Sequence, residues 1–341
     1  MNKDVLKQFG LDIQQTRLLF SMQRYIVEQD IGIEKNEKYK EKKVQWLHIW
    51  EKGILQVLNN ADNKTNLDFI TGEEELRKTC NHIIDINKNF NISQYLILLE
   101  LSLFVPYFPI GEFQAKFYER VSLDTKYADF LLEKFAGMLE VDKEFIERYR
   151  KTFKNSIRSI SGFYTRMLIG AGVGAVLLAI TAGFAAPFIG GLAAPLGLYG
   201  AAAVNAGLAA LGGGAVAAGG FGIAGGLCVI VGGGTIFGVL SGGVMGAALS
   251  SSSEFALREG AKLEVVMKEI ILLAQKDVRL AQEMIKSQQD VIRELEKQLC
   301  DLKFNEKENK ERIKTLAKSI DYLRNSLNSS YKVLNDIETT A

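Results

Sequence analysis

The feature that most constrains this chain is a run of 87 residues, 167 to 253, that contains no charged side chain. A membrane-spanning helix needs about 20 consecutive apolar residues, so the run is long enough for about four such helices. A soluble core does not easily absorb a continuous uncharged stretch of this length. The sequence therefore predicts a region that inserts into a membrane.

Prolines and glycine triplets divide this apolar run into shorter pieces. The breaks fall at Pro187, Pro195, Gly212–Gly214 and Gly232–Gly234, and the pieces lie near 167–186, 199–211, 215–231 and 235–250. We expect two to four membrane-crossing or re-entrant helices.

Glycine is concentrated in the same run, since 24 of the 32 glycines of the chain lie between Gly170 and Gly246. In lipid there is little hydrophobic drive between helices, so small residues that allow close backbone approach favour helix association. Glycines recur every four residues in one series of four and in two pairs: Gly234, Gly238, Gly242 and Gly246; Gly170 and Gly174; Gly222 and Gly226. We predict that these eight glycines pack membrane helices together, the alternative being chance spacing in a glycine-rich run.

Basic and aromatic residues stand directly before the apolar run, where residues 148 to 166 contain no acid. Cations that meet anionic lipid and rings that lie at the interface both suit a headgroup region. The predicted collar consists of Arg148, Arg150, Lys151, Lys154, Arg158, Arg166, Phe163 and Tyr164, with Tyr149 and Phe153 among them. We expect the collar to contact an anionic bilayer, the alternative being a solvated basic helix face.

Residues 1–166 have the pattern of an N-terminal helical bundle, and strand signals are nearly absent. After a first helix that contains Ile13, Phe20 and Ile26, the expected helices lie near 35–60, 73–104, 112–139 and 142–166. The apolar stretch from Tyr95 to Ile110 is closed by Pro106 and Pro109, which favours a buried core helix over a re-entrant membrane segment.

Residues 261–341 contain neither Gly nor Pro, and their apolar residues follow a heptad pattern with few polar exceptions. The pattern comprises Ile292, Leu295, Leu299, Leu302, Ile313, Leu316, Ile320, Leu323, Leu327, Leu334 and Ile337, and extends backward through Ala274, Val278, Ala281 and Ile285. It predicts a coiled-coil-like helix, about 100 Å long over residues 271–337, that packs on the N-terminal helices. The alternatives are an oligomerisation zipper and a hairpin that bends between Phe304 and Arg312.

Nothing in the sequence predicts catalysis, a metal or a cofactor. His48 and His82 are the only histidines, and neither has a metal-binding spacing or lies beside a nucleophile. Gly220, Gly222 and Gly225 match the dinucleotide pattern G-x-G-x-x-G, but no strand–helix–strand unit surrounds them. The formal charge of +1 gives no reason to expect nucleic acid.

These features together predict an all-α fold in three parts: an elongated helical bundle (1–166), a glycine-rich membrane-inserting region (167–253) and a long heptad-patterned helix or helical hairpin (254–341). The first 20 residues lack the apolar segment of a secretory signal, so we expect cytosolic synthesis without a cleavable signal and membrane association in the active state. Release from the cell is left open. Cys80, Cys228 and Cys300 are expected to be free thiols.

This layout resembles the α-helical pore-forming toxins of the cytolysin A and tripartite haemolysin type. The resemblance is architectural: an extended helical body, a large apolar insert between its helices, and 341 residues without an enzymatic motif. It implies an apolar head that is sequestered, then enters a bilayer after a conformational change and assembles as a homo-oligomer, with partner subunits left open. The insert Met167–Ser253 is longer and richer in glycine than the head of that family.

Three functions therefore compete. The one that we expect is a triggered pore-forming protein, toxin or effector, that oligomerises through its glycine faces and permeabilises a bilayer. The second is a constitutive integral membrane channel or effector of intracellular antiviral defence. The third is a membrane scaffold or tether that forms no pore.

Overall fold

The computed structural model describes residues 11–61, 67–86, 92–107, 115–118, 120–161 and 253–339. Within these ranges the chain is helical and contains no strand, which confirms the predicted all-α helical bundle. The eight glycines predicted to pack membrane helices lie outside the described residues, as do Arg166, Phe163 and Tyr164 of the collar. Among the described helices, none combines the length and the hydropathy that a membrane span requires.

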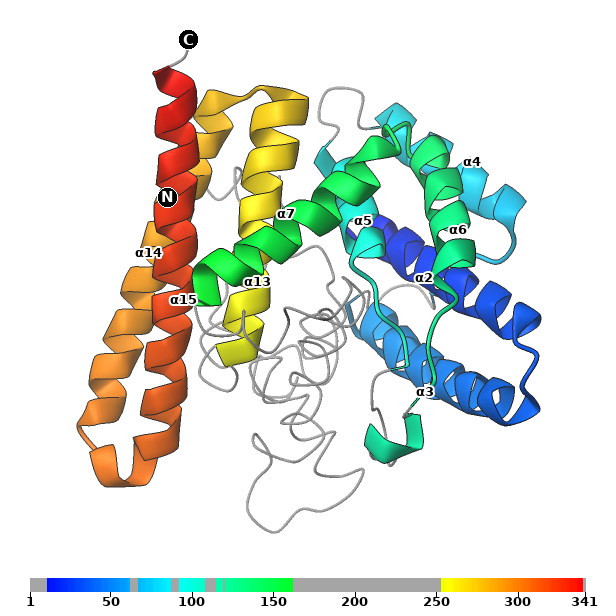
Figure 1. Ribbon diagram of the computed structural model, residues 1–341, viewed down its shortest axis with the longest axis horizontal. Coiled ribbons are helices and arrows are strands. Elements are labelled where there is room, and N and C mark those ends of the chain that lie inside the picture. The colour runs from blue at the N-terminus through cyan, green and yellow to red at the C-terminus, as the bar shows by residue number, and fades with distance from the viewer. Residues whose placement is uncertain are drawn as a thin grey trace.

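The N-terminal part of the structure is a group of helices that pack around a common core (Figure 1). Its elements are α2 (Ile13–Ile33), α3 (Glu37–Ala61), α4 (Glu73–Ile86), α5 (Ile92–Ser102), the 3-10 turn η1 (Ala115–Tyr118), α6 (Thr125–Met138) and α7 (Glu144–Ser161). Side-chain caps fix where two of them begin. Asp12 accepts hydrogen bonds from the backbone N–H groups of Gln14 and Gln15, and Asp124 accepts one from Tyr127.

Stacked aromatic rings fill the core between α2 and α3. Trp46 and Trp50 are one turn apart on α3 and stack with ring centroids 5.8 Å apart. Phe20 of α2 makes an edge-to-face contact with Trp50, with ring centroids 6.1 Å apart. Phe69 stacks on Trp50 with centroids 5.9 Å apart. Such rings each bury a large apolar area, so they account for much of the packing energy here.

A buried polar cluster, which we call the Asp30 hub, ties the same helices together. The Asp30 carboxylate accepts hydrogen bonds from the Tyr107 hydroxyl and from the backbone N–H of Asp124, and it pairs with Lys43 Nζ at 2.7 Å. Lys43 Nζ also lies 2.9 Å from Glu34. Burial, together with the negative charge of Asp30, raises the pKa of Tyr107, so its hydroxyl remains a donor.

The predicted N-terminal helices are partly confirmed. The helices expected near 35–60 and 142–166 correspond to α3 and, within the described residues, α7. The one expected over 73–104 is two helices, α4 and α5, and α5 is the predicted buried core helix that ends before the prolines. The one expected over 112–139 is wrong: α6 begins only at Thr125, because the hub holds the Asp124 N–H and Arg120 adopts a left-handed φ of 67°.

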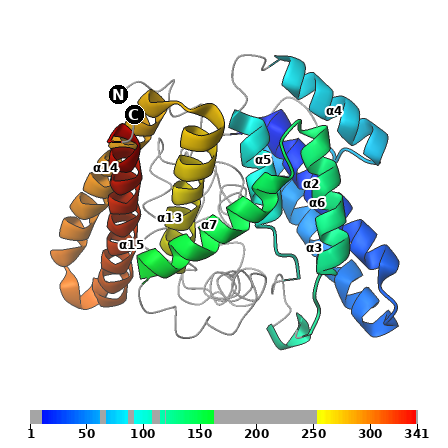
Figure 2. The same ribbon diagram turned by 45° about the horizontal axis from the view of Figure 1, so that its top comes forward.

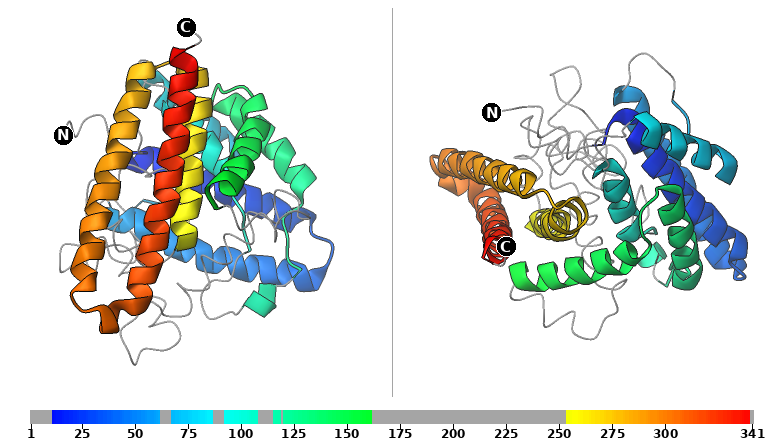
Figure 3. Two further views of the ribbon diagram at one scale, coloured as in Figure 1. Left: turned by 60° about the vertical axis from the view of Figure 1, so that its left-hand side comes forward. Right: turned by 90° about the horizontal axis from the view of Figure 1, so that it is seen from above.

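The C-terminal part consists of helices that run up and down beside one another (Figure 3). These are α13 (Ser253–Val265), the π-helix η3 (Val266–Gln275) that continues it, α14 (Val278–Lys303) and α15 (Glu306–Glu338). Asp277 caps α14 by accepting a hydrogen bond from the N–H of Leu280 at 2.9 Å.

A single 100 Å rod over residues 271–337 is therefore wrong, and the hairpin alternative holds. The chain reverses at Phe304 and Asn305, and α15 returns alongside α14 (Figure 3). The physical reason is that each heptad face covers the other, which buries both within one chain. The buried heptad positions include Ala281, Ile285, Ile292 and Leu295 on α14 and Leu316, Ile320, Leu323 and Leu334 on α15.

Candidate functional site: the base of the apolar insert

Two helices hold the two ends of the segment that contains the apolar run, since α7 ends at Ser161 and α13 begins at Ser253. They cross in direct contact, and the end of α7 also reaches α15 (Figure 2). With α5 and η3 alongside, these helices form what we call the base of the insert. The chain therefore leaves and re-enters the described helices at this base.

The buried face of α7 is apolar and includes two aromatic residues of the predicted collar region. Tyr149 and Phe153 are one turn apart and at most 1% exposed, in line with Ile146, Ile157 and Ile160. Burial raises the pKa of Tyr149 well above its usual value. These two rings are therefore core residues in this form and do not lie at a surface, contrary to the interfacial role that the sequence predicted for them.

Two of the collar cations are paired with carboxylates of the protein itself. Arg148 Nε lies 2.8 Å from Oε2 of Glu269 on η3, although half of the arginine side chain is exposed. Arg150 lies 2.7 Å from Asp129 on α6 and donates to the carbonyl oxygen of Ser102 at the end of α5. Both arginines therefore hold α7 against its neighbours.

The remaining described cations of the collar, Lys151, Lys154 and Arg158, form what we call the cationic stripe. Their i, i+3, i+7 spacing places them along one line of α7, away from its buried face. Lys151 is exposed and the other two are half-buried, and none of the three forms an ion pair with a described residue. Among the described cations of the collar, these three are the ones without a carboxylate partner in the described part of the chain.

A buried ion pair that sequence patterns did not predict joins α5 to α13. Lys262 Nζ lies 2.8 and 3.0 Å from the two oxygens of Glu100 and 3.4 Å from Glu259, and the Lys262 and Glu100 side chains are at most 2% exposed. Burial raises the pKa of Glu100, and the attraction of Lys262 opposes that rise. The partners are 162 residues apart, so no local pattern could have revealed them.

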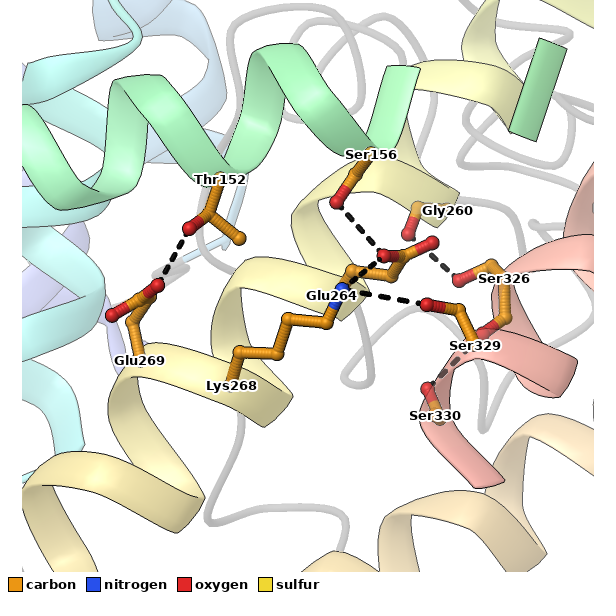
Figure 4. Close-up of polar contacts among 9 residues, drawn as sticks. All are labelled: Thr152, Ser156, Gly260, Glu264, Lys268, Glu269, Ser326, Ser329 and Ser330. Carbon is orange, nitrogen blue, oxygen red and sulfur yellow. Dashed lines mark hydrogen bonds and ion pairs between the residues drawn. The ribbon is translucent and has the colours of Figure 1, made fainter. Parts of the chain in front are cut away.

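Two further carboxylates of the C-terminal part reach hydroxyl groups on α7 (Figure 4). Ser156 donates to Glu264 at 2.9 Å, and Thr152 donates to Glu269 at 2.5 Å. The Lys268 ammonium donates to the same oxygen of Glu264 at 2.7 Å. We refer to Glu100, Glu259, Glu264 and Glu269 together as the carboxylate seam, because they lie along the contact of α5 and α7 with α13 and η3.

A close approach of three helices completes the base at Gly260. The Ser326 hydroxyl of α15 donates to the Gly260 carbonyl at 2.7 Å (Figure 4). A Cβ at position 260 would lie 3.3 Å from the Ser326 Cβ and 3.5 Å from the Ile160 side chain of α7. Sequence reasoning missed this glycine because it lies outside the apolar run. The signal that could have revealed it is the row of serines at 319, 326 and 330, all fully buried.

The histidines and cysteines of the described residues do not gather into a metal-binding group. Among the described residues, no group of His, Cys, Asp and Glu could hold a metal ion, and His48 and His82 are exposed on α3 and α4. Cys80 and Cys300 are free thiols, and burial raises the pKa of Cys80 to about 12. The base is built from ion pairs, hydroxyl contacts and helix packing.

Comparison of the chain with protein-family models, with curated proteins and with solved structures finds no match.

Proposed function

We propose that this protein is a pore-forming protein whose residues 167–253 insert into an anionic bilayer and oligomerise there, while the described helices anchor them. The observation that carries the proposal is the absence of charge from those 87 residues. At the overall charged fraction of 24%, a stretch of that length would contain about 21 charged residues. Each such charge would oppose insertion by roughly 2.5–3.5 kcal/mol at the centre of a membrane helix.

The cationic stripe supports the same proposal, because it lies on the helix that leads into the apolar run. A cation close to an anionic leaflet contributes about 1 kcal/mol to binding. Three cations on one line of α7 therefore favour the surface of such a membrane, and salt screens the attraction. This agrees with an insert whose N-terminal flank comes to rest at the headgroups.

The tether alternative depended on a long helical rod, which the structure does not contain over residues 271–337. A long rod would have separated the membrane from a distant partner, but α14 and α15 fold back on each other. A constitutive membrane channel remains the competing function. It is separated from a triggered protein by fractionation, since a constitutive channel requires detergent for extraction.

The decisive experiment is dye release from vesicles by the full-length purified protein. Vesicles with and without anionic lipid should be compared at low and high salt. We expect release from anionic vesicles that salt weakens, together with a membrane-bound oligomer detected by crosslinking. Binding without release would support a scaffold, and neither binding nor release would refute the proposal.

The glycine spacing provides a second arm of this experiment. Replacing Gly238 and Gly242 by Leu makes the segment more apolar and more prone to form a helix, so membrane binding should persist. Oligomers and dye release should decrease, because the added side chains prevent close helix approach. Unchanged release would show that the spacing of these glycines is accidental.

A further inference from the structure

The helix is interrupted between η3 and α14, although the sequence on either side of the break has the pattern of a continuous helix. The heptad phase continues through the break without a slip, from Ala274 to Val278 and Ala281. No Gly or Pro occurs among residues 261–341. A heptad pattern of this kind favours one continuous helix, so the pattern does not explain why the chain bends here.

The backbone of the break is itself unfavourable. Lys276 adopts a left-handed conformation with φ 54° and ψ 34°, which a residue with a side chain rarely adopts and which glycine usually supplies at the end of a helix. The ten residues before it form a π-helix, a geometry that proteins use mostly as single turns and often at functional sites.

A tertiary contact on one side and a local cap on the other hold this bend in place. Glu269 on η3 accepts from Thr152 and pairs with Arg148, both on α7. On the other side of the bend, the Asp277 side chain caps α14. The bend is therefore maintained by the contacts of Glu269 with α7 together with the local cap at Asp277, against a heptad pattern that favours a continuous helix.

We propose that η3 and the Lys276–Asp277 turn form a two-state joint. In its second state η3 rewinds to an α-helix, and α13 and α14 become one helix from Ser253 to Lys303. Rewinding withdraws Glu269 from α7, which breaks one part of the base and frees Arg148 to join the cationic stripe. The joint itself is independent of the proposed function, and only its trigger, contact of the stripe with an anionic bilayer, rests on that function.

One substitution fits the bent state and forbids the straight one. Val278 is the first residue of α14, a position where proline is tolerated, and Asp277 before it is extended with φ −103° and ψ 91°, as a residue before proline prefers. In a continuous helix, proline at position 278 would lack the N–H and would clash with the preceding turn. Val278→Pro therefore locks the bend, and Val278→Ala is its matched control.

A second substitution favours the straight state. Asp277→Ala removes the cap of α14 and replaces a poor helix former by the best one. If the joint exists, the amides of residues 278–280 gain helical hydrogen bonds to the preceding turn and exchange more slowly. If Asp277 is only a cap, the same amides lose protection because the end of the helix frays.

The test is hydrogen exchange at residues 278–280 in the full chain, in solution and on anionic vesicles. We expect protection to rise by about tenfold in Asp277→Ala without lipid, and in the parent on vesicles. Val278→Pro should abolish vesicle-induced protection at Arg279 and Leu280 together with dye release, whereas Val278→Ala should retain both.

Each outcome assigns its failure to one proposal. Lower protection in Asp277→Ala, or dye release by Val278→Pro equal to that of Val278→Ala, would overturn the joint. Dye release by the parent without any change of exchange at 278–280 would also overturn the joint while leaving the proposed function intact. Slow exchange in Asp277→Ala, with no vesicle binding by any variant, would retain the joint and overturn the proposed function.

Discussion

Two lysine–carboxylate pairs are buried in the described part of the molecule, and they differ in how fully the surrounding charges are satisfied. In the Asp30 hub, the carboxylate has a lysine, a tyrosine hydroxyl and a backbone N–H as partners. On α13, which supplies Lys262, the Nε of Arg258 and the Oε1 of Glu264 are buried without a hydrogen-bond partner among the described residues, whereas the unpartnered buried atoms of α2 and α3 belong to the neutral side chains of Gln23 and Trp50. A buried polar group without a partner costs about 1–3 kcal/mol.

This difference indicates which junction opens first. The hub joins segments that all precede the apolar run, up to 94 residues apart, and satisfies the charges it buries. The base of the insert joins α5 and α7 to helices that follow the apolar run, and it carries uncompensated polar groups. If the insert moves, as we propose, the base is the contact that yields while the hub keeps the N-terminal helices together.

The largest effect on stability is expected at the hub. Lys43→Met keeps the length of the side chain but leaves Asp30 buried without its cation. We expect the free energy of unfolding to fall by about 3–5 kcal/mol, measured by urea denaturation. The control is Glu296→Gln, which breaks an exposed pair with Arg324 and should cost less than about 1 kcal/mol. Equal losses of free energy in the two variants would show that the buried hub pair contributes no more than an exposed pair.

The corresponding change at the base should cost less. Lys262→Met leaves Glu100 without its cation, but burial already raises the pKa of Glu100, so the carboxyl can take up a proton instead of remaining charged. We expect a loss of about 2–3 kcal/mol in the same urea assay. A loss larger than that of Lys43→Met would reverse the order of the two junctions.

Packing at the base can be tested separately from charge. Gly260→Leu places a side chain where a Cβ alone would lie 3.3 Å from Ser326, so we expect a loss of about 1–2 kcal/mol. The matched control is Gly137→Ala on α6, where nothing lies within 4 Å of the added Cβ. That control should stabilise the protein by roughly 0.5–1 kcal/mol, since Ala favours a helix over Gly. Thermal unfolding of both variants would show whether close helix approach matters at the base.

The pH dependence of the free energy of unfolding provides a further test of the base. Because the folded pKa of Glu100 is raised above its ordinary value of 4.5, the folded state holds a proton that the unfolded state releases. The contribution of Glu100 is therefore fully present below pH 4.5 and is lost as the pH rises through the raised folded pKa. Glu100→Gln should lack this decline, so its stability relative to the parent should increase with pH across that window. If the free energies of unfolding of Glu100→Gln and of the parent changed with pH in parallel, the raised pKa of Glu100 would be contradicted.

The smallest effect on folding is expected from the cationic stripe, whose role is predicted to lie in binding. Replacing Lys151, Lys154 and Arg158 by Gln should leave the free energy of unfolding nearly unchanged, because none forms an ion pair with a described residue. Binding to anionic vesicles at low salt should weaken by up to about 3 kcal/mol, roughly 100-fold. The control is a triple variant that removes the same charge from exposed positions on or beside α3: Lys35→Gln, Lys38→Gln and Lys52→Gln. Equal weakening in both variants would show that net charge, and not the stripe, drives binding.

The sequence by itself determined the class of the fold and the position of its unusual segment. Helical periodicity located α3 and α7, and the apolar stretch before Pro106 located the core helix α5. The heptad pattern identified the buried faces of α14 and α15 correctly. These features depend on neighbours within a few turns, which is the range over which periodicity carries information.

Only the tertiary structure decided where the helices stop and which charges meet. A heptad pattern fixes a face but not a length, so it left a straight rod and a hairpin bending between Phe304 and Arg312 as alternatives and did not predict the left-handed Lys276. Composition grouped Arg148 and Arg150 with the collar, whereas folding pairs them with Glu269 and Asp129. Such pairs form because burial removes water from charges that distant parts of the chain bring together, and their separation in sequence leaves no periodic trace.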